Sequence, residues 1–201
     1  MPKFAANLSM LYNEHDFIDR FAAAAKDGFQ GVEYLFPYAF EKEVLAEALT
    51  ANGLTQVLHN MPAGDWDAGE RGLACLPDRV GEFQDGVGTA IDYAKALGCT
   101  QLHAMAGVRP EGADADKLDE TYIENLRFAA QKTEQAGIKL LIEAINTIDI
   151  PGFYLSTSAQ ALAVIDSVGS DNLYFQYDIY HMQIMEGDLA RTIEKHLAKI
   201  P

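Results

Sequence analysis

The stretch that decides the fold reads AGIKLLIE, at residues 136–143. It places a glycine at the end of a helical pattern, and a short apolar run that ends on Glu143 follows at once. Glycine readily adopts the left-handed conformation that closes many helices, so Gly137 predicts a helix end. A short apolar run bounded in this way is typical of a buried strand.

The same order of helix, glycine and strand recurs along the chain. The other joints lie at residues 27–28, 52–53, 97–98 and 168–169. Strands are predicted at 4–8, 31–35, 54–59, 100–103, 138–143 and 173–178. Helices are predicted at 79–97, from about 118 to 133, and from a start near 156–158. Strands that alternate with helices favour parallel pairing through right-handed crossovers.

Two architectures fit this alternation: a doubly wound sheet and a (β/α)8 barrel of the TIM type. A doubly wound nucleotide-binding sheet usually carries a glycine-rich fingerprint after its first strand, and residues 7–12 read NLSMLY instead. Six predicted strands end on or near a polar side chain: Asn7, Glu33, His59, His103, Glu143 and Asp178. A parallel barrel builds its active site on that face. We therefore expect the barrel, although other open sheets stay possible.

Composition limits the classes of protein and partner. A chain of 201 residues with 49% hydrophobic content fits one domain over residues 1–201. A net charge of −15 disfavours nucleic acid and anionic membranes, and suits a divalent cation, a small polar metabolite, or solubility alone. No apolar run approaches a membrane span, residues 1–7 contain no extended apolar region of the kind that signal peptides have, and Cys75 and Cys99 lack a metal-binding spacing. We therefore expect free thiols and a cytoplasmic location.

Glu143 and Asp178 are the strongest candidates for chemistry. They end neighbouring predicted strands, and such strands lie about 4.8 Å apart. Two carboxylates so close repel each other, and a divalent cation would relieve the repulsion. The alternative is that the two residues cap loops or pair with lysines.

Two histidines are candidates for contact with a substrate. His181 follows Asp178 by three residues, at the turn from strand to helix, where an imidazole can bind a substrate oxygen or donate a proton. His59 ends the third strand, before a long loop that carries the single Trp66. The alternatives are a solvent-facing histidine at 181 and a core histidine at 59. Direct catalysis by Glu33 or His103 is not expected.

At these residues the sequence resembles the hydroxypyruvate isomerase family, within the xylose isomerase-like TIM barrels. The matching segments span the chain: 4–11, 31–33, 36–38, 58–66, 68–72, 124–127, 142–146, 149–153 and 176–183. The long matches are specific, whereas a lone Asp-x-x-His would not be. The chain departs from the family at Ala144, where proline is usual after the glutamate.

The resemblance implies a barrel that binds Mg or Mn. Glu143 matches a residue that is both metal ligand and catalytic carboxylate, and Asp178 matches a second ligand. His59 and His181 match positions that contact the substrate. The implied reaction interconverts hydroxypyruvate and tartronate semialdehyde, in glyoxylate metabolism. A proton beside the carbonyl is removed to give an enediolate and is returned to the neighbouring carbon, while the metal stabilises the charge.

The resemblance also implies eight β/α units, whereas the pattern here gives about six. We therefore expect a barrel that is truncated at its carboxyl end, without a further ligand from strand seven and a second catalytic glutamate from strand eight. The explanations are a shortened sequence, a fragment completed by another chain, or a natural non-catalytic remnant. On this basis we expect the 201-residue chain to lack most isomerase activity.

Other functions remain open at this point. A 2-oxotetronate isomerase and a sugar 3-epimerase would use the same enediolate chemistry on other small-molecule substrates. A non-catalytic binding or assembly protein belongs to a different class, and a homo-oligomer is possible. A metal-dependent endonuclease on a related barrel is disfavoured by the charge of −15. The sequence does not fix the metal, the substrate or the oligomeric state.

Overall fold

The computed structural model describes residues 3–201, in which short strands alternate with helices. The strands are β1 (Ala5–Asn7), β2 (Gly31–Glu33), β3 (Thr55–Asn60), β4 (Gln101–His103), β5 (Lys139–Glu143) and β6 (Leu173–Gln176). The α-helices are α1 (Asp19–Lys26), α2 (Lys42–Asn52), α3 (Val80–Leu97), α4 (Ala115–Gln135), α5 (Ser158–Val168), α6 (Ile179–Met185) and α7 (Leu189–His196). Two short 3-10 helices cover Pro77–Arg79 and Leu197–Lys199.

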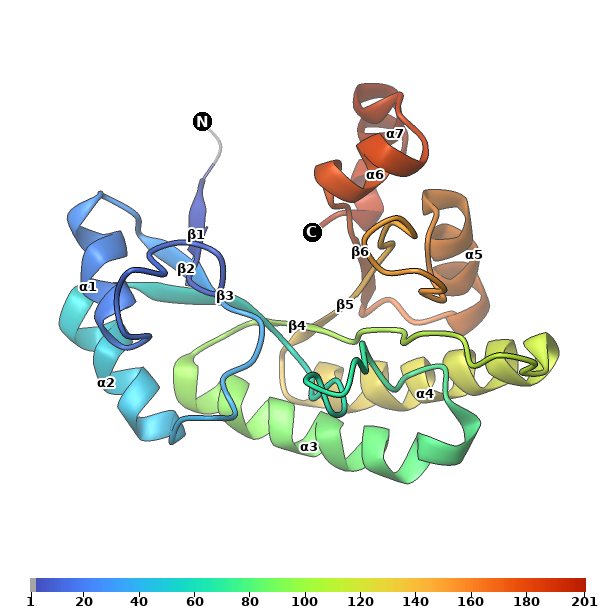
Figure 1. Ribbon diagram of the computed structural model, residues 1–201, viewed down its shortest axis with the longest axis horizontal. Coiled ribbons are helices and arrows are strands. Elements are labelled where there is room, and N and C mark those ends of the chain that lie inside the picture. The colour runs from blue at the N-terminus through green and yellow to red at the C-terminus, as the bar shows by residue number, and fades with distance from the viewer. Residues whose placement is uncertain (1–2) are drawn as a thin grey trace.

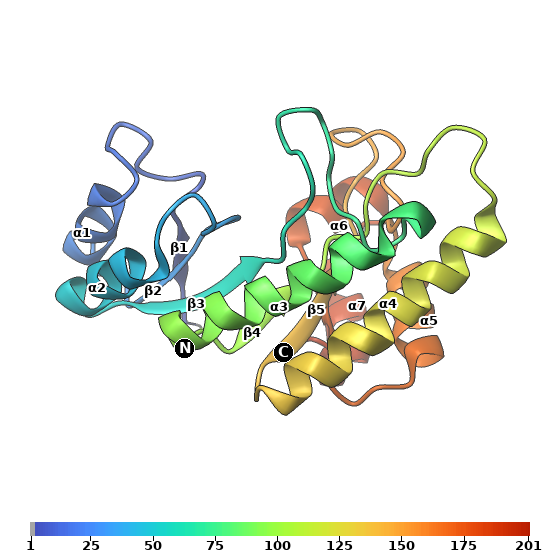
Figure 2. The same ribbon diagram turned by 90° about the horizontal axis from the view of Figure 1, so that it is seen from below.

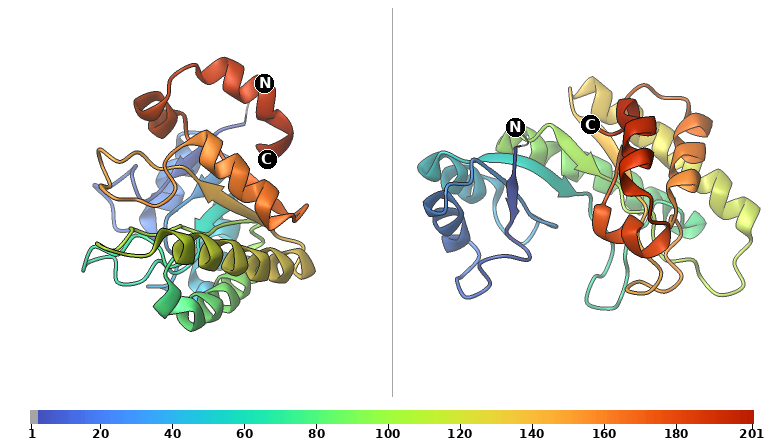
Figure 3. Two further views of the ribbon diagram at one scale, coloured as in Figure 1. Left: turned by 90° about the vertical axis from the view of Figure 1, so that its right-hand side faces the viewer. Right: turned by 90° about the horizontal axis from the view of Figure 1, so that it is seen from above.

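The six strands form one parallel sheet in the order of the sequence, from β1 to β6. Helices α1 to α5 flank the outer side of this curved sheet (Figure 1). Figure 3 shows α1 and α2 on the β1 side of the molecule, and α5 to α7 on the β6 side. This is the (β/α) arrangement of a TIM barrel, as predicted, although β1 and β6 do not pair with each other.

The strand ends all point the same way, because every pairing is parallel. The loops that follow β3, β4 and β5 rise together on one side of the sheet (Figure 2). Consequently, side chains at the carboxyl ends of these strands share one face of the molecule, which is the face that parallel barrels use for catalysis.

The helix ends follow the predicted glycine pattern. All five glycines at the predicted joints have positive φ: Gly28, Gly53, Gly98, Gly137 and Gly169. At the other end of α5, the Thr157 hydroxyl accepts the amide of Gln160, within the predicted start at 156–158. None of the helices among residues 3–201 has the length and apolar character that a membrane crossing requires.

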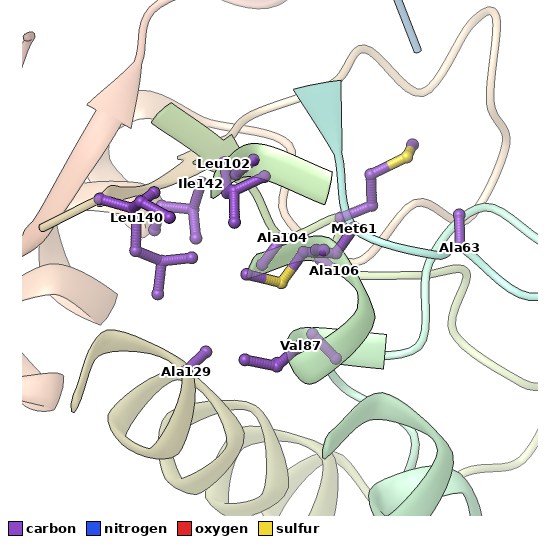
Figure 4. Close-up of a cluster of buried hydrophobic side chains, with 14 of the residues drawn as sticks. Met61, Ala63, Val87, Leu102, Ala104, Ala106, Ala129, Leu140 and Ile142 are labelled. Atoms are coloured by element: carbon purple, nitrogen blue, oxygen red, sulfur yellow. The ribbon is translucent and has the colours of Figure 1, made fainter. Parts of the chain in front are cut away.

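The main core lies between the sheet and its outer helices. Leu102 on β4 and Leu140 and Ile142 on β5 are fully buried, and they pack toward Val87 of α3 and Ala129 of α4 (Figure 4). Cys75 and Cys99 are buried free thiols, as predicted. Since apolar side chains of the strands cover the outer face, the polar side chains at alternate positions face the inner side of the sheet.

The loop between β3 and α3 is tied to the end of β4. Gly72 forms an antiparallel bridge with Ala106, and its φ is 122°. A Cβ atom at this glycine would lie 2.6 Å from the carbonyl carbon of Met105. Arg79 holds the loop from the other side, because its Nη1 lies 2.6 Å from Oε1 of Glu70. The loop is therefore closely packed against the carboxyl ends of the strands.

Candidate active site

Glu143, Asp178 and His181 meet at the carboxyl ends of β5 and β6. Each offers one ligand atom, and the three atoms lie within 4.8 Å of one another. Glu143 is the last residue of β5, and its partner in the β6 register is Gln176, two residues before Asp178. Because side chains alternate along a strand, Gln176 and Asp178 follow the same face as Glu143. The structure thus brings together three of the four predicted site residues.

The two carboxylate oxygens of Asp178 make different contacts. This residue lies at the N-cap of α6, where Oδ1 accepts the backbone amides of Tyr180 at 2.7 Å and His181 at 3.1 Å. Because the chain turns into α6 at Asp178, β6 ends at Gln176, two residues before the predicted end at 178. The other oxygen, Oδ2, lies 3.9 Å from Nε2 of His181 and remains available to a ligand.

Glu143 is the least solvated carboxylate of the site, with 8% of its surface exposed. Burial raises the pKa of its carboxyl well above the ordinary value, and the charge of Asp178 raises it further. A hydrogen bond from the Gln176 amide opposes these effects, and Glu33 adds a smaller repulsion. In the absence of a cation, the site therefore favours the protonated form of Glu143.

His103 is a further member of the site. Its Nδ1 lies 3.0 Å from Oδ1 of Asn60, to which it donates, and 3.7 Å from Oε2 of Glu143. Burial, with a smaller contribution from His181, lowers the pKa of His103 to about 3, so the ring is neutral. Its contact with Glu143 is therefore not an ion pair. The sequence predicted His103 at the end of a strand. Its contact with Glu143 on the inner face depends on the register between β4 and β5, which the sequence pattern does not give.

Glu33 extends the acidic surface across the inner face. It ends β2 and accepts a hydrogen bond of 3.1 Å from Nδ2 of Asn7 at the end of β1. Burial raises its pKa, the bond from Asn7 lowers it, and the charge of Asp178 raises it. The charge of Asp178 thus opposes ionisation of both Glu33 and Glu143, and a cation on this face would favour their ionised forms.

The structure does not bring His59 to the other three residues. It precedes Asn60 on β3, so the two side chains lie on opposite faces of the strand. The His59 ring is fully buried, lies against the Ala90 backbone of α3, and packs edge-on against Tyr38 with ring centroids 6.2 Å apart. The alternative of a core histidine describes this position, and β3 ends one residue later than predicted. We therefore leave His59 out of the site.

Asn146 is a residue that the sequence reasoning did not single out. It is fully buried, three positions beyond Glu143, and its Nδ2 lies 2.8 Å from Nδ1 of His181. The same amide nitrogen donates to Oδ2 of Asp149 at 2.9 Å. The available signal was its position in the predicted loop beside the strand-end carboxylate, and spacing alone does not show which side chain such a loop residue contacts.

This fold and this strand-end site agree with comparisons with known proteins. Residues 21–200 match the family model described as "Xylose isomerase-like TIM barrel". A crystal structure titled AP endonuclease, family 2, from Brucella melitensis superimposes with a TM-score of 0.97 at 49% identity, over 100% of this chain and 77% of that one. The chain therefore belongs to the xylose isomerase-like TIM-barrel family.

Two curated relatives narrow the class. The chain is 52% identical to hydroxypyruvate isomerase of Escherichia coli (strain K12), over 100% of this chain and 78% of that protein. It is 51% identical to 2-oxo-tetronate isomerase of Cupriavidus necator, over 100% of this chain and 77% of that protein. The chain is thus a hydroxypyruvate isomerase-like enzyme, as the resemblance predicted. A structure of L-ribulose 3-epimerase, at 23% identity and a TM-score of 0.73, shares the fold.

Proposed function

We propose that the protein interconverts hydroxypyruvate and tartronate semialdehyde at the site formed by Glu143, Asp178 and His181. The observation that carries the proposal is the convergence of a buried carboxyl, a second carboxylate and an imidazole within 4.8 Å. A carbonyl shift between neighbouring carbons needs a group that moves a proton and groups that stabilise the developing negative charge. The similarity to hydroxypyruvate isomerase supports the three-carbon substrate.

The donor set fits a divalent cation such as Mg or Mn. Carboxylate oxygens are the ligands that these hard cations prefer, and Glu143 and Asp178 each offer one at this position. Burial and the charge of Asp178 raise the pKa of Glu143, and a cation held by both carboxylates would oppose these two effects. We propose that Glu143 and Asp178 hold the cation, which when bound would stabilise the enediolate charge and the ionised form of Glu143.

The residues of the chain then divide the work. Glu143 removes a proton from C3 of hydroxypyruvate. The electron pair of the C–H bond forms the C2–C3 double bond, and the pair of the C2–O2 double bond moves to O2, which gives the enediolate. Return of the proton to C2, with transfer of the hydroxyl proton from O3 to O2, gives tartronate semialdehyde. A buried carboxylate is a strong base because water solvates it poorly. His181, whose Nε2 lies 3.9 Å from Oδ2 of Asp178, would donate a hydrogen bond to a substrate oxygen.

The 2-oxo-tetronate isomerase relatives favour a second candidate substrate. One is 51% identical and another, from Haemophilus influenzae, is 43% identical over 97% of the chain. The substrate of such an enzyme has one more carbon and would use the same proton transfer. Both substrates therefore belong in one assay.

The experiment follows exchange and turnover together. Purified protein is incubated in deuterium oxide with Mg and either hydroxypyruvate or 2-oxo-tetronate, and NMR detects deuterium at the carbon beside the carbonyl and the isomerised product. We expect deuterium exchange with hydroxypyruvate in the wild type and its loss in Glu143→Gln, because the amide cannot accept the proton. The amount of product tests the expectation that the 201-residue chain lacks most isomerase activity. Asp166→Asn, an exposed residue of α5, is the matched control and should behave as wild type.

The outcomes of this assay distinguish the proposed base, the substrate and the cation site from their alternatives. Exchange that persists in Glu143→Gln would exclude Glu143 as the base. Faster turnover of 2-oxo-tetronate would assign the second substrate. Calorimetry with Mn tests the cation separately: equal binding by wild type and by Glu143→Gln would remove the proposed ligand, whereas Glu143-dependent binding without turnover would keep the metal site and reject the isomerase.

A further inference from the structure

The side-chain amide of Asn146 can point only one way. Its Oδ1 accepts two backbone amides, that of Asp149 at 2.8 Å and that of Ile148 at 3.1 Å. A backbone N–H only donates, so the atom that receives both bonds is the oxygen. The other atom of the amide is therefore the NH2 group, and it carries two hydrogens to donate.

Both of these hydrogens have acceptors. Nδ2 of Asn146 lies 2.9 Å from Oδ2 of Asp149 and 2.8 Å from Nδ1 of His181. Hydrogen bonds from Asn146 and from the Tyr180 hydroxyl lower the pKa of Asp149, so its carboxylate is the ionised acceptor near neutral pH. Since Nδ2 is a donor, Nδ1 of His181 must offer a lone pair.

We propose that Asn146 is a positioning residue whose NH2 group fixes Nδ1 of His181 as a hydrogen-bond acceptor and so leaves the ring proton on Nε2. A neutral imidazole has one N–H, and its location is set by the bond that the other nitrogen makes. Nε2 lies 3.9 Å from Oδ2 of Asp178, so the N–H is on the side of the ring that faces the site. His181 is then a hydrogen-bond donor to substrate, and Nε2 has no lone pair to bind a cation.

The consequence is a division among the three clustered groups, and it rests on the proposed function. The carboxylates of Glu143 and Asp178 are the cation ligands, while His181 is the donor to a substrate oxygen. Two hydrogen bonds also hold His181 in place. Its backbone amide donates to Oδ1 of Asp178, and its Nδ1 accepts from Asn146 in the loop after β5. Asn146 thus couples the end of β5 to the first turn of α6.

The test is the tautomer of His181 measured by 15N NMR of the imidazole nitrogens. Cation-free protein is used, since Mn is paramagnetic, and loss of one signal in His181→Gln assigns the ring among the five histidines of the chain. We expect a protonated Nε2 and an unprotonated Nδ1 in the wild type. A protonated Nδ1 would overturn the proposal.

A matched pair of variants tests the cause. Asn146→Asp keeps an oxygen for the amides of Ile148 and Asp149 but can only accept from His181, so it should move the proton to Nδ1 or protonate both nitrogens. It is made together with Asp149→Asn, to avoid two facing carboxylates. Asp149→Asn alone is the control, because it leaves the bond from Asn146 to His181, and it should keep the wild-type signals.

The outcomes separate this proposal from the isomerase assignment. A neutral Nε2–H tautomer that persists in the double variant would reject the role of Asn146. The expected loss of that tautomer should lower kcat roughly 10- to 100-fold with a smaller change in KM, as loss of a supporting bond does at other sites. If the tautomer changes and turnover does not, Asn146 still sets the tautomer and His181 is not the donor in catalysis.

Discussion

Nδ1 of His103 lies 3.7 Å from Oε2 of Glu143, and burial moves the pKa values of the two groups in opposite directions. It lowers that of the imidazole and raises that of the carboxyl, so both groups favour their neutral forms. The contact between a histidine and a glutamate therefore contributes no ion pair. Among residues 3–201, no Lys or Arg forms an ion pair with Glu33, Glu143 or Asp178 on the inner face. The protonation of these carboxyl groups therefore has consequences that can be measured.

Without a cation, Glu143 should make stability fall as pH rises. Its folded pKa is raised, so above the unfolded value of about 4.3 the folded protein keeps a proton that the unfolded chain has lost. The stabilisation is present at low pH and is lost as pH rises toward the folded pKa. We expect Glu143→Gln to flatten this profile in urea unfolding with a chelator present, and to be at least as stable as wild type at pH 8. A parallel profile in wild type and variant would contradict this.

His59 should make the stability of the fold rise with pH, which is opposite to the effect of Glu143. Burial lowers the pKa of His59 to about 4, so the folded protein resists a proton that the unfolded chain accepts below about 6.5. Stability is present above pH 6.5 and is lost as pH falls toward 4, by an amount on the order of 3 kcal/mol. His59→Gln should reduce this slope in urea unfolding between pH 7 and 4, with a remainder from His103, whose pKa burial lowers to about 3. His15→Gln, at an exposed position, should keep the full slope. Equal slopes in all three proteins would refute the assignment.

Two substitutions of Asp178 distinguish its role as the N-cap of α6 from its proposed role as a cation ligand. Asp178→Asn keeps an oxygen that can accept the amides of Tyr180 and His181, so its stability without metal should be near that of wild type. Asp178→Ala loses the cap and should cost about 1 kcal/mol. Both variants should lose the rise in melting temperature that saturating Mn gives the wild type. A Mn response that survives in Asp178→Asn would show that this carboxylate is not a ligand.

Gly72 should tolerate no side chain. Alanine there would overlap the carbonyl group of Met105 and would have to adopt a φ of 122°, so Gly72→Ala should destabilise the fold by several kcal/mol. Gly88→Ala is the matched control, because this glycine is exposed within α3 with no atom within 4 Å of the new Cβ. The control should gain up to about 1 kcal/mol from helix propensity. Similar urea midpoints for the two variants would show that the loop can move away from β4.

The location in the cytoplasm, the possible homo-oligomer and the identity of the cation stay predictions. The domain assignment to residues 1–201 does as well.

The sequence by itself determined the order of the elements and the edge on which the site lies. Glycine at the helix ends and short apolar strands are local features, so their pattern predicted six β/α units with strand bounds close to those observed. Parallel pairing then places Glu143 and Asp178 at the same edge, because consecutive strands of such a sheet are neighbours.

The tertiary structure decided which side chains share the inner face. The sequence predicts that β3 ends at His59, whereas the strand continues to Asn60. Because side chains alternate along a strand, Asn60 faces the site and contacts His103, and His59 faces the helices. The place of His103 beside Glu143 depends on register between strands far apart in sequence. The pKa of Glu143 and the orientation of the Asn146 amide depend on burial and on partners from other elements, and no local pattern encodes these.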